Sequence, residues 1–207
     1  LNANTKISTT GGGSINVTGA ENAVGSLGHF AIFMEPASSI TGSGAGAAIT
    51  LTGDSLVLGE SGAGRGLVSG SGTFTIQPRT VGKTIGVTRA SGDLSLPSSY
   101  FTSHFTDGFS DINIGSTTAG TITVGGITAL SDNTAFITGA NIAVNAALNA
   151  AGQTLTLTGG NGGTVSGDGN ITAADLLLNG SGTTYALNTA TGNNVGTLAA
   201  SAGSGNI

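Results

Sequence analysis

Residues 107–144, DGFSDINIGSTTAGTITVGGITALSDNTAFITGANIAV, form the stretch of sequence that decides the fold. Within it, Gly, Ser, Asn and Asp separate short runs that alternate apolar and polar residues, at positions 112–114, 121–124, 136–137 and 141–144. The alternation is typical of short β-strands, and the separating residues are typical of tight turns. The stretch therefore predicts strands of a few residues joined by closely spaced turns.

The predicted strands recur with a period of about twenty residues. Ile122 recurs as Ile142, and Val124 recurs as Val144. The same spacing continues on both sides, in the series Leu56, Ile76 and Leu96, the series Phe74, Leu94 and Ile114, and the series Ile137, Leu157, Leu178 and Leu198, in which the middle step is one residue longer. A repeat of this length indicates a coil that the chain traces about ten times.

The constant spacing predicts that each strand pairs in parallel with its equivalent in the next coil. In an antiparallel meander, equivalent residues would alternate in direction, and a helical repeat would need a period of 3.6 that no long segment has. We therefore expect an all-β fold, a parallel β-helix (solenoid) with coils of about 20 residues, with aliphatic columns inside and Asn113, Thr123 and Thr156 pointing outwards. Residues 1–207 would form a single solenoid segment, with the clearest repeats at 55–200.

The composition limits both the core and the function. Of 207 residues, 38 are glycine and 3 are proline, while 7% are charged and 4% are aromatic; such a chain can build a narrow core from stacked Ile, Val and Leu. Disorder is disfavoured because the net charge is only −5 and the apolar residues are clustered. Five Lys plus Arg provide no basic surface for nucleic acid, and without cysteine there is neither a disulfide nor a thiolate metal site.

The two ends of the sequence suggest a piece of a longer protein. Leu1 does not begin a signal peptide, so we expect either that a signal was removed or that the sequence is an internal piece of a longer chain. No run approaches the roughly 18 apolar residues of a membrane span. Residues 204–207 include no polar capping element, so the last coil would expose strand edges. We expect either that the native chain continues or that the ends stack on other copies.

One segment, residues 97–110, interrupts the repeat. Phe101, Phe105 and Phe109 are spaced by four, as on one face of a helix. Pro97 would start a short helix over residues 98–106, which would lie on the flank of the solenoid and end at Asp107 and Gly108. The aromatic rings would form either a buried patch or a platform for sugar rings, and the general preference of Phe for burial favours the patch.

Three short motifs favour structural roles. Residues 81–84, VGKT, end like a phosphate-binding loop, but Gln77 stands where its first glycine would be. The neighbouring cations Arg79, Lys83 and Arg89 could bind an anionic sugar or phosphate, although exposed loop charges are usually only solvated. Residues 168–176 match the second half of a calcium loop from Asp168 to Asp175, but the first half lacks ligands, so a simple turn is preferred to Ca²⁺. We expect no cofactor.

The acidic residues leave a second possibility open. Carboxylates from neighbouring coils of a β-helix can share one groove, and Asp93, Asp111 and Asp132 are roughly one coil apart. However, they do not occupy equivalent positions, and His29 and His104 have no neighbour in sequence that suggests a catalytic relay. We therefore expect no catalytic residues, with a carbohydrate-active or carbohydrate-binding groove near Asp93 and Asp111 as the alternative.

A resemblance to a known family gives these expectations a context. The motifs that carry it are TFTIQP at 73–78, TIGV at 84–87, DLSL at 93–96, DGF at 107–109, INIG at 112–115 and TITV at 121–124. In this order they resemble the repeats of filamentous-haemagglutinin-like large bacterial exoproteins, adhesins exported by two-partner secretion or as autotransporters. The match covers about residues 70–160, and the family's Asn-rich export domain is not seen.

The resemblance implies a right-handed parallel β-helical shaft that is secreted or displayed on the bacterial cell surface. Such a shaft would serve cell adhesion, biofilm or fibre formation without catalysis, and the family's shaft supplies no catalytic residues. Its partners would be other copies of itself, surface glycans or host and matrix ligands. The candidate ligand or interface surface lies where the short helix meets the coils, and comprises Tyr100, Phe101, Phe105, Asp93 and Asp111.

Overall fold

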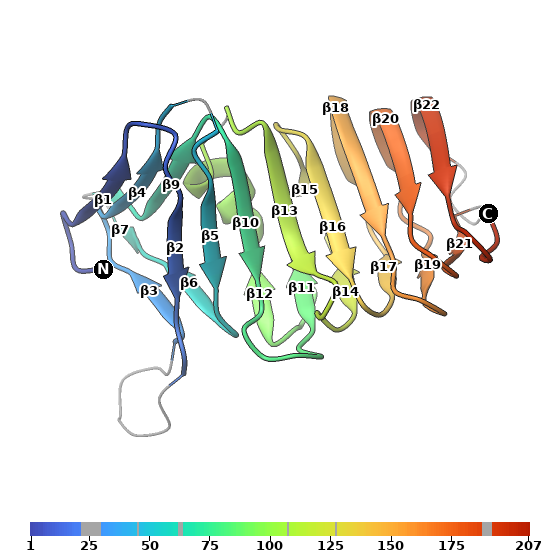
Figure 1. The fold of residues 1–207 in the computed structure, drawn as a ribbon, viewed down its shortest axis with the longest axis horizontal. Coiled ribbons are helices and arrows are strands. Elements are labelled where there is room, and N and C mark those ends of the chain that lie inside the picture. Colours follow the sequence, from blue (N-terminus) through green and yellow to red (C-terminus); the bar gives the residue numbers. More distant parts are fainter. Residues whose placement is uncertain (22–29, 45, 62–63, 107, 127, 188–191) are drawn as a thin grey trace.

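The computed structural model describes residues 1–207 except 22–29, 45, 62–63, 107, 127 and 188–191. The protein is elongated, and its two termini lie at opposite ends of the long axis (Figure 1). It is an all-β structure, as the alternating sequence predicts, and nearly every described strand pair is parallel, as the regular spacing of the repeat predicts.

The largest sheet runs along the whole molecule. Its main path comprises β2 (Ile15–Thr18), β5 (Ile49–Thr52), β10 (Thr73–Gln77), β13 (Asp111–Ser116), β16 (Thr134–Thr138), β18 (Leu148–Thr158), β20 (Ile171–Asn179) and β22 (Asn194–Ser201), and the short β15 (Thr128–Ala129) pairs with β18 beside this path. Neighbouring strands on the path follow the order of the sequence. We call this the long sheet, and we call the residues from one of its strands to the next a rung.

The remaining strands form smaller sheets. A six-stranded sheet has the order β12 (Leu94–Leu96), β11 (Ile85–Val87), β14 (Ile122–Val124), β17 (Ile142–Val144), β19 (Thr164–Ser166) and β21 (Thr184–Ala186). Nearer the N-terminus, β1 (Lys6–Thr9), β4 (Ser39–Gly42) and β9 (Leu67–Gly70) form a three-stranded sheet, and β3 (Ile32–Met34) pairs with β6 (Leu56–Leu58). The one antiparallel pair among the described strands is β7 (Glu60–Ser61) with β8 (Gly64–Arg65).

The core consists of apolar columns that run across successive rungs. One column in the long sheet contains Val17, Leu51, Ile76, Ile114, Phe136, Leu157 and Leu178. Another, in the six-stranded sheet, contains Ile85, Ile122, Ile142, Val165 and Tyr185. Residues between these inward positions, such as Thr75 and Asn113, are partly exposed. Alternation thus gives each strand one buried and one outer side.

The predicted period is correct for part of the chain. Three predicted pairs are confirmed: Ile122 with Ile142, Val124 with Val144, and Leu157 with Leu178. The predicted pairs of Ile137 with Leu157 and of Leu178 with Leu198 are wrong in register. Ile137 pairs with Thr158, and Leu178 pairs with Ala200. The main path of the long sheet has eight strands, fewer than the ten coils that a constant period predicts.

The period fails between β10 and β13 because the chain doubles back between β11 and β12. Ile85 pairs in parallel with Leu94, only nine residues later, whereas parallel neighbours usually need about a dozen connecting residues or more. Thr88 and Arg89 take left-handed φ angles of 39° and 60° in this tight connection. The predicted series of Phe74, Leu94 and Ile114 is therefore wrong: Phe74 pairs with Ile112, 38 residues away.

The predicted flanking helix is present but shorter and of a different type. A π-helical segment, η1 (Tyr100–His104), follows Pro97, instead of an α-helix over 98–106. Phe105 is already extended, at φ −88° and ψ 106°; its N–H bonds to the carbonyl of Tyr100, and it bridges to Val68. This pairing draws Phe105 out of the helix. Asp107, at the predicted helix end, lies outside the described residues.

Candidate functional site

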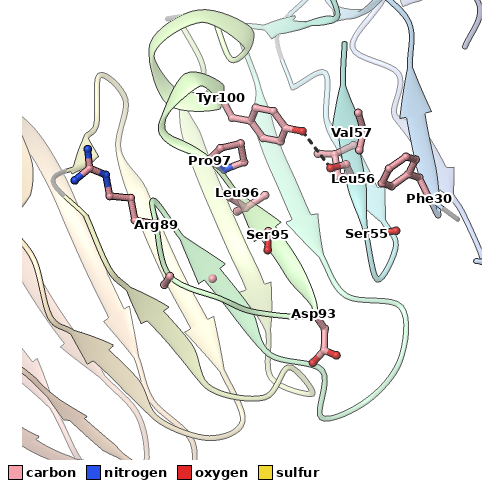
Figure 2. A pocket seen from close by; sticks show the side chains of 12 residues that line it. Phe30, Ser55, Leu56, Val57, Arg89, Asp93, Ser95, Leu96, Pro97 and Tyr100 are labelled. Carbon is pink, nitrogen blue, oxygen red and sulfur yellow. Dashed lines mark hydrogen bonds between the residues drawn. The ribbon is translucent and has the colours of Figure 1, made fainter. Parts of the chain in front are cut away.

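A groove lies between the two-stranded sheet and the edge of the six-stranded sheet. The pair β3–β6 and the edge strand β12 lie on the same flank but belong to separate sheets. Between them is a cavity of about 440 Å³, which we call the flank groove (Figure 2). Its lining residues are Phe30, Ser55, Leu56, Val57, Gly86, Arg89, Ala90, Asp93, Ser95, Leu96, Pro97 and Tyr100. Two of the predicted surface residues, Asp93 and Tyr100, therefore lie in one groove.

Tyr100 closes one part of the groove by serving as a hydrogen-bond partner for β6. Its hydroxyl donates to the Leu56 carbonyl at 3.1 Å (Figure 2). The same hydroxyl accepts from the Leu58 N–H at 2.9 Å. The backbone groups of Ser55 and Gly59 face β3 and bond to it. The Leu58 N–H and the Leu56 carbonyl face the opposite side, where a further parallel strand would bind them. Burial raises the pKa of Tyr100, so its hydroxyl keeps the proton that it donates.

The other predicted aromatic residues are part of the core. Phe101 is 7% exposed and Phe105 is 4% exposed. Phe105 packs edge-on against Phe74, at a centroid distance of 4.9 Å, and Phe109 stacks on Phe74 at 5.3 Å. A sugar-stacking platform formed by these rings is therefore excluded, and the alternative of a buried patch is confirmed.

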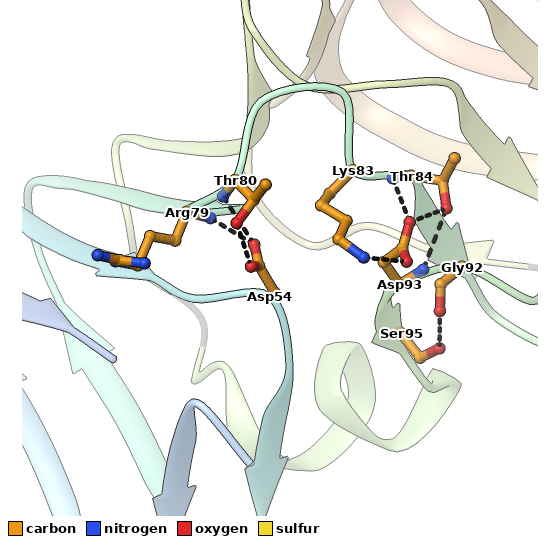
Figure 3. Close-up of polar contacts among 8 residues, drawn as sticks. All are labelled: Asp54, Arg79, Thr80, Lys83, Thr84, Gly92, Asp93 and Ser95. Carbon is orange, nitrogen blue, oxygen red and sulfur yellow. Dashed lines mark hydrogen bonds and ion pairs between the residues drawn. The ribbon is translucent and has the colours of Figure 1, made fainter. Parts of the chain in front are cut away.

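Asp93 anchors the loop between β10 and β11 at the rim of the groove. Lys83 Nζ donates to its Oδ1 at 2.8 Å, and the Thr84 N–H and hydroxyl donate to Oδ2 at 2.9 and 2.8 Å (Figure 3). The hydrogen bond from Lys83, followed by those from Thr84, lowers the pKa of Asp93 to about 2. A carboxylate with this pKa carries no proton at neutral pH, so it is unsuited to general acid catalysis.

Asp54 fixes the other end of the same loop. Its Oδ1 accepts from the N–H groups of Arg79 and Thr80, and its Oδ2 accepts from the Thr80 hydroxyl at 2.6 Å (Figure 3). Burial alone would raise the pKa of Asp54, but the hydrogen bonds from Thr80 and Arg79 together lower it. The loop that resembles a phosphate-binding motif is thus held by two carboxylates, one of which pairs with Lys83.

The predicted carboxylates do not converge. Asp111 is exposed at the start of β13 in the long sheet, opposite Thr73, whereas Asp93 precedes β12 in the six-stranded sheet. Asp132 is buried and accepts from the Gly108 N–H at 2.9 Å. A shared carboxylate groove at Asp93 and Asp111 is therefore wrong, because the two residues lie in different sheets.

The half calcium loop is a turn followed by strand β20, in which Asp175 lies opposite Thr154. Asp168 and Asp175 are both exposed, and Gly169 packs so closely on the preceding rung that a Cβ there would lie 2.3 Å from the Ala146 carbonyl oxygen. Within the residues that the structure describes, no group of three or more His, Asp or Glu side chains could hold a metal ion. His29 lies outside those residues.

The sequence did not predict the exposed aromatic pair beside the groove. Phe30 and Phe33 stack at 6.0 Å and are 44% and 43% exposed. Phe30 lines the groove, and Phe33 projects outwards from the middle of β3. The run of apolar residues at 30–34 does not alternate, and this was the available signal that one side chain would face solvent.

Comparisons of the chain with protein-family models, curated proteins and solved structures found no significant match. Among the described residues, no helix is long and apolar enough to cross a membrane.

Proposed function

We propose that this chain is a right-handed parallel β-helix that serves as a shaft segment of an extracellular adhesive protein. The observation that carries the proposal is the column from Val17 to Leu178, in which seven rungs place an apolar residue at the same inward position. Repeated parallel connections favour the right-handed sense. A column of this kind extends along one axis by adding rungs, which suits a spacer better than an enclosed site.

Side-chain amides support the same role by linking neighbouring rungs. Asn133 Oδ1 accepts from the Thr154 N–H at 2.9 Å, and Asn141 Oδ1 accepts from the Thr164 N–H at 2.8 Å. Asn193 Oδ1 accepts from the Ile171 N–H in the preceding rung at 2.8 Å. These amides provide backbone partners where strand pairing ends, so they stiffen the stack without charge.

We propose that the partner of the C-terminal face is a second copy of the chain. β22 is the last strand of the long sheet, and a cavity of about 510 Å³ beside it is lined by Leu176, Leu178 and Leu198. Leu198 is 59% exposed and Ile207 is 67% exposed. An open strand edge next to exposed apolar side chains favours addition of another strand.

Sedimentation velocity over a range of concentrations tests this association. We expect concentration-dependent oligomers for the unaltered chain and a monomer for Leu198→Lys. The matched control is Val81→Lys, which should still associate. Val81 is 75% exposed and lies in the loop between β10 and β11, which is several strands away from β22. A monomer at high concentration for the unaltered chain would reject the self-association.

The extracellular, cell-surface location is proposed on the family resemblance of residues 73–124. Labelling intact source cells with an antibody to this segment tests it, with a cytoplasmic protein as control. Surface staining without permeabilisation supports the location, and staining only after permeabilisation contradicts it.

A second candidate function is carbohydrate binding in the flank groove, which the exposed pair Phe30 and Phe33 favours. Aromatic faces stack on sugar rings, and Ser55 and Ser95 line the same groove with hydroxyl groups. In a glycan-array experiment we expect Phe30→Ala to abolish any binding and Val81→Ala to preserve it. An array without signal, or binding that survives Phe30→Ala, would reject this candidate.

A further inference from the structure

His104 is a buried histidine whose two ring nitrogens both face acceptors. Its side chain is fully buried. Nδ1 lies 2.7 Å from the carbonyl oxygen of Gly66, and Nε2 lies 3.0 Å from Oε1 of Glu60. A carbonyl and a carboxylate only accept hydrogen bonds, so both contacts are satisfied together only when both ring nitrogens carry a proton.

Both acceptors belong to one small hairpin, Glu60 in its first strand and Gly66 at its base. Glu60 lies in β7, which pairs with β8, and the N–H of Gly66 bonds to the carbonyl of Gly59 at 3.0 Å to close its base. His104 therefore contacts the hairpin at its base and on its first strand. The Glu60 side chain remains 54% exposed, so solvent can replace His104 as its partner.

We propose that the protonated ring of His104 latches this hairpin onto the flank of the protein, and that the hairpin loosens when the ring loses its proton. A neutral ring keeps one N–H. It must then give up the bond to Gly66 or turn an unprotonated nitrogen towards the Glu60 carboxylate, and either change weakens the attachment.

The charged groups around His104 are consistent with this latch. A hydrogen bond from His104, followed by one from Ser99, lowers the pKa of Glu60, and Arg65 across the hairpin acts in the same direction. Tyr100 meets the His104 ring edge-on at 5.2 Å and stays neutral because burial raises its pKa. The strands β9 and β15, which also pack on η1, contain no titratable side chain.

The two partners define a pH window for the latch. Glu60, whose pKa is lowered in the folded state, contributes above the ordinary glutamate pKa, and its contribution is lost as the pH falls through the lowered value. The bonds to Gly66 and to Glu60 coexist only on a doubly protonated ring, so one of them is lost once the ring is neutral. The hairpin is therefore held most firmly in mildly acidic solution.

Two NMR measurements on the whole chain test the proposal. Ring ¹⁵N shifts of His104 at pH 5.5 should report two protonated nitrogens. Between pH 5.5 and 8.5, hydrogen-exchange protection of the Gly66 amide, corrected for intrinsic rates, should fall at least about tenfold relative to Ile114. In Glu60→Gln the neutral amide removes the charge pairing with His104, so the protection of the Gly66 amide at pH 5.5 should fall.

Asp168→Asn, which removes an exposed carboxylate elsewhere, is the matched control and should change neither readout. Three results would each overturn the latch: a singly protonated His104 at pH 5.5, equal protection of Gly66 at both pH values, or unchanged protection of Gly66 at pH 5.5 in Glu60→Gln. Because Glu60 is at the surface, that variant should fold even if substitutions at His104 do not.

Discussion

Individual residues determine which side chains form the core. Phe136 is fully buried in the central column, whereas its neighbour Ile137 is only partly buried on the other side of β16. The twenty-residue series placed Ile137 in the column, but Phe136 pairs with Leu157. A shift of one residue exchanges the two sides of a strand, so the register has a direct energetic consequence.

Because Phe136 faces the core and Ile137 faces the other side of β16, we expect substitutions at these two adjacent positions to lower stability unequally. Phe136→Ala should lower the free energy of unfolding by about 3–5 kcal/mol, because it leaves a cavity in a packed column. Ile137→Ala, the matched neighbour, should cost only about 1 kcal/mol. Urea denaturation measures both values, and a larger loss for Ile137→Ala would contradict the register.

Asp93 predicts a pH-dependent contribution to stability. Its pKa of about 2 in the folded protein lies below the ordinary value of 3.8, so its contribution is present above about pH 4 and is lost as the pH falls towards 2. Asp93→Asn should lower the Tm at pH 7 by about 1–3 °C, a small effect because the ion pair is exposed. The difference from the unaltered protein should shrink progressively below pH 4 and be much smaller at pH 2 than at pH 7.

Calorimetry at pH 7, 4 and 2 measures this effect, with Asp168→Asn as an exposed control. A Tm difference for Asp93→Asn that is the same at all three pH values would show that the loop does not depend on the ionised carboxylate.

At the scale of elements, the sequence predicted strands better than their connections. Alternation located β13, β14, β16 and β17 within the opening stretch. It did not predict that β11 and β12 would pair, because the connection turns through Thr88 and Arg89, which have no preference for left-handed φ. Aromatic spacing suggested a helix through Phe105, but pairing with Val68 overrode that local preference.

The flank groove depends on the connection between β11 and β12, which the sequence did not predict. Asp93 and Tyr100 were both predicted as surface residues, yet the groove between them exists because β12 pairs with β11 and leaves β6 without a strand on that side. Such a gap depends on contacts between residues about forty positions apart, such as Tyr100 and Leu56. A sequence pattern with a period of twenty cannot encode it.

Tyr100→Phe tests whether the hydroxyl replaces a strand neighbour for β6. The change leaves the Leu58 N–H and the Leu56 carbonyl without their partner and should cost about 1–3 kcal/mol. Thr102→Ala, which removes an exposed hydroxyl from the same helix, should have little effect. Hydrogen exchange at the Leu58 amide gives the local readout, and unchanged protection in Tyr100→Phe would contradict the bridging role.

At the scale of the whole molecule, the fold depends on the stacking of rungs. Parallel in-register pairing places Thr123 beside Ala143, and Ala143 beside Ser166, on the outer side of the six-stranded sheet. Neighbouring strands are about 4.8 Å apart, so positions two strands apart are separated by about 10 Å. The natural chain has no cysteine, which makes engineered pairs easy to interpret.

Disulfide formation between engineered cysteines therefore tests the stacking most directly. Thr123→Cys with Ala143→Cys should oxidise almost completely at low protein concentration, because a disulfide spans Cα atoms roughly 4.4–6.8 Å apart. Thr123→Cys with Ser166→Cys should remain reduced. Intact mass measures both. Efficient bonding of the adjacent pair alone is the predicted result, and equal bonding of both pairs, or bonding only between positions 123 and 166, would contradict the stack.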